Sequence, residues 1–114
     1  LGATIKAVQC VDRCVGRVYR AVAKRGGGVI VTGDHGNAEE MIDLKTGEID
    51  SEHNPHPVPF ILASPHHYRL QQGRISLASI APTICQLLGV PVPAVMTARS
   101  LISGMAKGRR QEPA

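Results

Sequence analysis

The sequence has 114 residues, of which 43% are hydrophobic and only 3% aromatic, and its formal net charge is +4. This length and composition predict one small globular domain, or a piece of a larger one, with a single modest core. The scarcity of aromatic residues argues against a nucleic-acid surface built on base stacking, and the absence of a run of about eighteen apolar residues argues against a membrane span. We therefore expect a cytoplasmic protein with no nucleic-acid or membrane partner, and the first residue, Leu1, suggests a processed or partial chain.

Two elements are expected in the first third of the chain. Apolar residues recur at spacings of three and four from Ile5 to Val22, which predicts an amphipathic helix with a basic outer face that ends at the glycine run 26–28. The apolar run Val29–Thr32 then predicts a short strand buried on both faces, as in parallel sheets. Cys10 and Cys14 lie four apart on the helix, and we interpret them as reduced, small hydrophobic residues, because two ligands do not complete a metal site.

The middle of the chain is polar and acidic. Residues 29–60 hold seven acidic residues and one lysine, whereas the segments on either side are basic. Within this acidic segment, residues 37–41 are expected to form a turn of helix and residues 43–52 a surface hairpin or loop. The acidic character favours cation binding in this part of the chain.

The last third is expected to contain a strand, a helix and a tail. Phe60–Ala63 predicts a second strand, bounded by prolines. Residues 75–90 predict a helix capped by Ser76 or Ser79 and stopped by Gly89, with a proline in its first turn. Residues 105–114 are polar and basic and are expected to form a tail.

The sequence "VTGDHGNAEEM" places Asp34 and His35 directly after the first predicted strand. In a straight strand these neighbours would point to opposite faces, so a shared metal ion requires a bend, which we place at Gly36. A carboxylate oxygen together with an imidazole nitrogen suits Mn²⁺, Zn²⁺ or Fe²⁺ better than Ca²⁺. Asp34 and His35 are therefore candidate metal ligands.

Further histidines follow the polar segment. If the second strand returns beside the first, His53 comes near Asp34 and His35, and His56 is the competing candidate. His66 and His67 follow the second strand, and we interpret them as ordinary loop residues.

Taken together, "TGDHGNAEEM", "HNPHPVPF" and "LASIAPTICQLLGVPVPAVMTARSLI" resemble the C-terminal end of the cofactor-independent (2,3-bisphosphoglycerate-independent) phosphoglycerate mutases of the alkaline phosphatase superfamily. The preceding "IKAVQCVDRCVGRVYRAV" is also similar to that family. The resemblance covers residues 1–104, which would be the C-terminal portion of a metal-binding phosphatase-like domain, and leaves residues 105–114 unexplained. It implies an α/β fold with a mostly parallel sheet flanked by helices.

The same resemblance implies a monomeric enzyme that interconverts 3-phosphoglycerate and 2-phosphoglycerate through a phosphoserine at a two-metal site. The metal is usually Mn²⁺, with Mg²⁺, Co²⁺ or Zn²⁺ possible. Asp34 and His35 would bind one metal and His53 the other. The chain departs from the family pattern at residues 54–56.

The resemblance places the serine nucleophile, the other ligands and the substrate-binding domain outside this chain. We therefore expect no catalytic residue within it and no activity from it alone. Two alternatives stay open: another metal-dependent phosphatase or phosphomutase of the superfamily, and a non-catalytic, metal-binding remnant.

Overall fold

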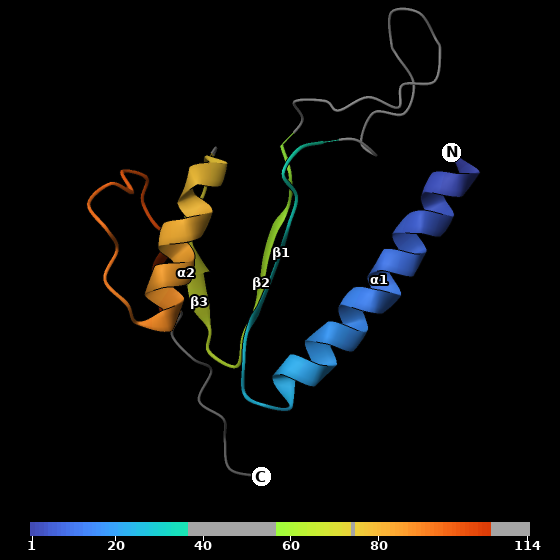
Figure 1. The fold of residues 1–114 in the computed structure, drawn as a ribbon, viewed down its shortest axis with the longest axis horizontal. Helices are drawn as coiled ribbons and strands as arrows, with labels where there is room; N and C mark the ends of the chain where they lie inside the picture. The colour runs from blue at the N-terminus through green and yellow to red at the C-terminus, as the bar shows by residue number, and fades with distance from the viewer. Residues whose placement is uncertain (37–56, 74, 106–114) are drawn as a thin grey trace, which may run out of the picture. The chain divides into compact units, whose positions relative to one another are not determined.

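The computed structural model describes residues 1–36, 57–73 and 75–105. The chain divides into two compact units, residues 1–65 and 66–114. In chain order (Figure 1) the described elements are α1 (Gly2–Ala23), β1 (Val29–Thr32), β2 (Phe60–Ala63), β3 (Tyr68–Leu70), a short 3₁₀ helix (Leu77–Ser79), α2 (Ile80–Leu88) and β4 (Ile102–Met105). Helices and strands both occur, which agrees with the α/β class.

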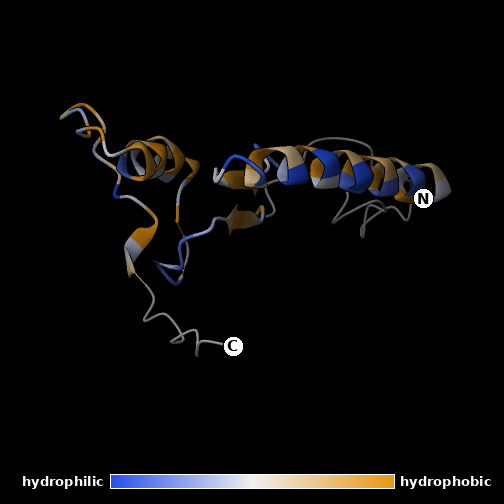
Figure 2. Ribbon diagram, turned by 90° about the horizontal axis from the view of Figure 1, so that it is seen from below, coloured by the Kyte–Doolittle hydropathy of each residue, from blue (hydrophilic) through white to orange (hydrophobic). Residues whose placement is uncertain are grey.

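The predicted first helix is confirmed as α1, and Figure 2 shows hydrophobic and hydrophilic residues alternating around it. Its last turn closes with hydrogen bonds from the Lys24 and Arg25 amides to the Arg20 and Val22 carbonyls. Gly26 follows with a φ of 74°, a conformation that glycine adopts without strain, so the glycine run ends the helix as predicted. No residue of this helix is buried in the part of the chain that the structure describes. None of the described helices is both long and apolar enough to cross a membrane.

Both predicted strands of the first unit are confirmed, and they pair with each other. The ladder runs from Val29 opposite Ala63 to Thr32 opposite Phe60 and is antiparallel. Val29, Ile30 and Val31 are half-buried rather than covered on both faces. The sheets formed by the described residues are two-stranded and antiparallel, not parallel, because each chain segment returns along the strand that it pairs with.

The second unit contains a strand pair that the sequence analysis did not predict. β3 pairs antiparallel with β4, with Tyr68 opposite Met105 and an irregularity between Arg69 and Leu70. The Gln71 amide continues this pairing by donating to the Leu101 carbonyl at 2.7 Å. β4 ends at Met105, the first residue of the predicted tail, and the rest of that tail lies outside the described residues.

The predicted helix of the second unit is confirmed as α2, which begins at Ile80 after a 3₁₀ turn, five residues later than the predicted range 75–90, and stops before Gly89 as predicted. The Ser76 hydroxyl accepts a hydrogen bond from the Ala78 amide at 3.1 Å, so Ser76 caps the 3₁₀ helix that precedes α2, whereas Ser79, directly before α2, makes no side-chain capping bond. Pro82 lies in the first turn of α2, where its missing amide hydrogen leaves no helical bond unmade. Gly89 has a φ of 68° and ends the helix in the left-handed conformation.

Thr83 connects α2 to the start of β4. Its side chain is 0% exposed, and its hydroxyl donates to the Ser79 carbonyl at 2.6 Å while accepting from the Leu101 amide at 2.8 Å. Leu101 and Ile102, which are 7% and 6% exposed, are the buried hydrophobic residues of the described chain. The Thr83 hydroxyl is therefore the hydrogen-bond acceptor for the buried Leu101 amide.

We predict that Thr83→Val will destabilise the second unit by about 1–3 kcal/mol. Valine has nearly the same shape as threonine, but it leaves the buried Leu101 amide without an acceptor. Thr83→Ser keeps the hydroxyl and is the matched control. Hydrogen exchange should show faster exchange of the Leu101 amide in the valine variant than in the serine variant, and equal protection in the two would contradict this role.

Candidate metal centre

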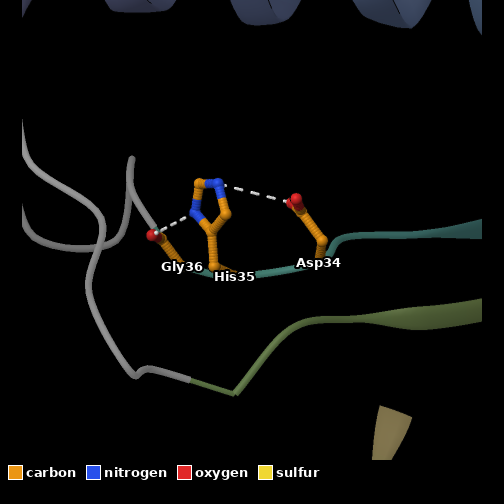
Figure 3. Close-up of polar contacts among 3 residues, drawn as sticks. All are labelled: Asp34, His35 and Gly36. Carbon is orange, nitrogen blue, oxygen red and sulfur yellow. Dashed lines mark hydrogen bonds and ion pairs between the residues drawn. The ribbon is translucent and has the colours of Figure 1, made fainter. Parts of the chain in front are cut away.

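Asp34 and His35 follow the end of β1, after Gly33. The chain bends at Asp34 and His35, one residue before the position that the sequence predicted. Figure 3 shows both side chains on the same side of the backbone, although they are neighbours in sequence. The bend therefore achieves the convergence that a straight strand would prevent.

The two side chains approach each other through potential metal-binding atoms. His35 Nε2 lies 3.4 Å from Asp34 Oδ1. Two donor atoms held about 2.1 Å from one metal ion lie about 3.0 Å apart for octahedral geometry and about 3.4 Å apart for tetrahedral geometry. The observed separation is within reach of both, so the pair fits as two ligands of one ion without a change of backbone path.

The Gly36 carbonyl fixes the orientation of the His35 ring. His35 Nδ1 lies 2.9 Å from that oxygen (Figure 3), and because a carbonyl can only accept, the hydrogen is on Nδ1. In the neutral ring the Nε2 lone pair then faces the Asp34 carboxylate, whereas in the protonated ring Nε2 carries a proton between the two groups. A metal ion would take the place of that proton. Histidine ligands in proteins are commonly oriented in this way by a second hydrogen bond.

The two candidate ligands differ in exposure. The Asp34 side chain is 88% exposed and the His35 side chain 33% exposed. The described residues contain no group of three or more His, Cys, Asp or Glu side chains placed to hold a metal. The described residues thus supply two candidate ligands, Asp34 and His35, and a complete metal site would need more.

The second strand brings the chain back to this end of the sheet. Val58 lies against Gly33, where an added Cβ would be 3.2 Å from the valine Cγ1. Only three residues of sequence separate His53 from Pro57, where the described chain resumes. His53 and its competitor His56 themselves lie outside the described residues.

The remaining histidines and the cysteines are placed elsewhere. His66 and His67 are exposed between β2 and β3, and the His66 ring makes an edge contact with Tyr68 at a centroid distance of 6.3 Å. Cys10 and Cys14 are free thiols, as predicted, but both are exposed, so they are not packed as small hydrophobic residues among the described residues.

The sequence did not reveal the role of the Gly36 carbonyl. Gly36 stood out as a turn residue, yet a backbone acceptor has no signature in the sequence, and only the observed bend places it beside Nδ1. The one available signal was chemical: a histidine ligand needs a partner for its other nitrogen.

Comparison with known proteins places this chain in a family. Residues 1–92 match the Metalloenzyme superfamily. The chain is 45% identical over 111 residues to a 2,3-bisphosphoglycerate-independent phosphoglycerate mutase of Thermomicrobium roseum, covering 94% of this chain and 21% of that protein. It is 45% identical over 100 residues to the mutase of the same name from Pseudomonas fluorescens, covering 88% and 19%.

A third relative, 2,3-bisphosphoglycerate-independent phosphoglycerate mutase 2 of Methanosarcina barkeri, is 46% identical over 101 residues, covering 88% of this chain and 19% of that protein. The chain thus spans about a fifth of the length of the curated relatives that it matches. Since the superfamily match extends over most of the sequence, this chain belongs to the Metalloenzyme superfamily.

Proposed function

We propose that this chain is part of a 2,3-bisphosphoglycerate-independent phosphoglycerate mutase, to which it contributes metal ligands. The observation that carries the proposal is the convergence of Asp34 Oδ1 and His35 Nε2 to 3.4 Å at the end of β1. Identities of 45% to named mutases support the same activity. The reaction would interconvert 3-phosphoglycerate and 2-phosphoglycerate through a phosphoserine.

The proposed ligand assignment divides three residues between two ions. Asp34 and His35 hold one ion and His53 the other. Bound Mn²⁺, or Mg²⁺, Co²⁺ or Zn²⁺ in its place, would supply Lewis-acid activation and charge neutralisation for transfer of the phosphoryl group. The bend after β1 and the register of β2 support this assignment. Together they bring Val58 against Gly33, at the end of the sheet where Asp34 follows.

The chain's own residues would bind and orient. The Gly36 carbonyl, 2.9 Å from Nδ1, holds the His35 ring with Nε2 toward Asp34. The Asp34 carboxylate adds negative charge beside that nitrogen and so favours a cation there. No residue of the chain is assigned as the nucleophile or the general acid.

The proposal extends to the surrounding protein. Residues 1–104 would be the C-terminal portion of an alkaline-phosphatase-like domain, in which strands outside this chain lie parallel to its own strands and cover them. The half-buried side chains of β1 are consistent with such additional neighbours. The complete enzyme would be a cytoplasmic monomer, and residues 105–114 would be a polar tail outside the domain.

The ligand assignment can be tested in a chimaera in which this chain replaces the matching segment of the T. roseum relative. We predict that His35→Ala, Asp34→Asn and His53→Ala will each lower the metal content and reduce mutase turnover by at least about 100-fold, because the alanine changes remove a ligand and asparagine removes the ligand's negative charge. His66→Ala, on the exposed bend between the sheets, is the matched control and should retain both metal and turnover. Elemental analysis and a coupled mutase assay give the two readouts.

Several results would count against this assignment. Full metal content in the His53→Ala protein, combined with loss in His56→Ala, would make His56 the ligand. A chimaera that binds metal and hydrolyses simple phosphate monoesters, yet does not interconvert phosphoglycerates, would favour another phosphatase of the superfamily. Retention of metal by the His35→Ala and Asp34→Asn proteins would remove the central observation from the site.

We also predict that the 114-residue chain alone will show no mutase activity. Its proposed ligands are shared between two ions, so each ion would be undercoordinated, and no residue in the chain is assigned to accept the phosphoryl group. Assay of the purified chain with 3-phosphoglycerate, from a host lacking its own mutase, measures this directly. Turnover by the isolated chain would show that the machinery is complete within these residues.

A further inference from the structure

Cys10 and Cys14 form an exposed pair of thiols on α1. Both are free and exposed, and both lie within the continuous helix Gly2–Ala23. Residues four apart on a helix have Cβ atoms about 5–6 Å apart, one turn above the other. Both sulfurs can therefore reach a single atom at bond lengths of about 2.3 Å.

The pair lies away from the apolar stripe of the helix. Val8, Val15 and Val22 recur every seven residues and mark the centre of that stripe. At about 100° per residue, Cys10 lies about 140° and Cys14 about 100° around the axis from it. If the apolar stripe packs against another element, Cys10 still faces away from that element and Cys14 lies at its edge. The two thiols are therefore accessible whether or not the stripe is covered.

The number of thiols decides which ligand suits the pair. Zinc in a structural site takes four protein ligands, and the described residues hold no group of three metal-binding side chains. A monosubstituted trivalent arsenical has two exchangeable positions, which two thiolates fill completely. We propose that Cys10 and Cys14 are a bidentate dithiol site for trivalent arsenicals of the form R–As(OH)₂.

The binding step is a condensation. Each cysteine sulfur forms a bond to arsenic, each displaced hydroxide leaves with the proton of that thiol, and two water molecules are released. Neither sulfur nor arsenic changes oxidation state, so no oxidant or reductant is needed. The second bond is intramolecular, and the fixed spacing on one helical turn raises its effective concentration.

Titration of the 114-residue chain with phenylarsine oxide tests the site. We expect one arsenical per chain by mass spectrometry, loss of two titratable thiols per arsenical, and an adduct that excess glutathione leaves intact but dithiothreitol removes. Cys10→Ser and Cys14→Ser should each weaken binding by about 100-fold, because a single thiol cannot chelate. Cys85→Ser, which alters the remaining cysteine on α2, is the matched control and should bind as the unaltered chain does.

A spacing control separates the helical site from capture by an unfolded chain. Asp12→Cys combined with Cys14→Ser keeps two thiols close in sequence but places them about 200° apart around the helix. This variant should bind at least about tenfold more weakly than the unaltered chain if the helix presents the pair. Equal binding by the spacing variant, loss of binding in Cys85→Ser, or full binding in either single variant at position 10 or 14 would each overturn the proposal.

Discussion

The antiparallel pairing of β1 with β2 is the constraint on which the candidate site depends. Its register puts Thr32 opposite Phe60, so the chain leaves and re-enters the sheet at the same end. Gly33 permits this close approach, since a Cβ there would lie 3.2 Å from Val58, tighter than ordinary van der Waals contact. Asp34 and His35 are consequently fixed at an end of the sheet to which the chain returns.

At that end, a short bend converts neighbouring residues into a convergent pair. The 3.4 Å separation between Asp34 Oδ1 and His35 Nε2 suits either an ion pair with a protonated His35 or a shared metal ion. The Gly36 carbonyl decides which nitrogen faces the carboxylate. A bound cation would occupy the space between these two atoms, and the local bend of the backbone brings them together.

The elements that the sequence predicted are those with strong local signals. α1 follows from apolar spacing over several turns. The 3₁₀ turn and α2 follow from the cap at Ser76 and the stop at Gly89, each of which acts within one turn. Asp34 and His35 could be selected as candidate ligands because a carboxylate and an imidazole lie side by side directly after a strand, at a turn that contains glycine. Their convergence was predicted as a requirement, although the bend falls one residue earlier than expected.

What the sequence did not predict depends on contacts between distant residues. β3 alternates, with Arg69 exposed between two half-buried residues, but its three residues are too few for a signal, and β4 contains Gly104, which is uncommon in strands. In the sequence Thr83 is a single polar residue on a predicted helix. Its hydrogen bond with the Leu101 amide joins residues eighteen positions apart. A parallel sheet was predicted from a short apolar run. Such a run indicates that a strand is buried, but not whether the neighbouring strand runs parallel or antiparallel to it.

The most direct measurement of the central claim is histidine footprinting of the chimaera with and without Mn²⁺. Diethyl pyrocarbonate reacts with an accessible imidazole nitrogen, and a bound metal ion blocks that nitrogen. The account predicts that Mn²⁺ will protect His35 and His53 while leaving the modification of His66 and His67 unchanged, as resolved by peptide mass spectrometry. Equal modification of His35 in the presence and absence of Mn²⁺, in a protein shown to contain the metal, would contradict it.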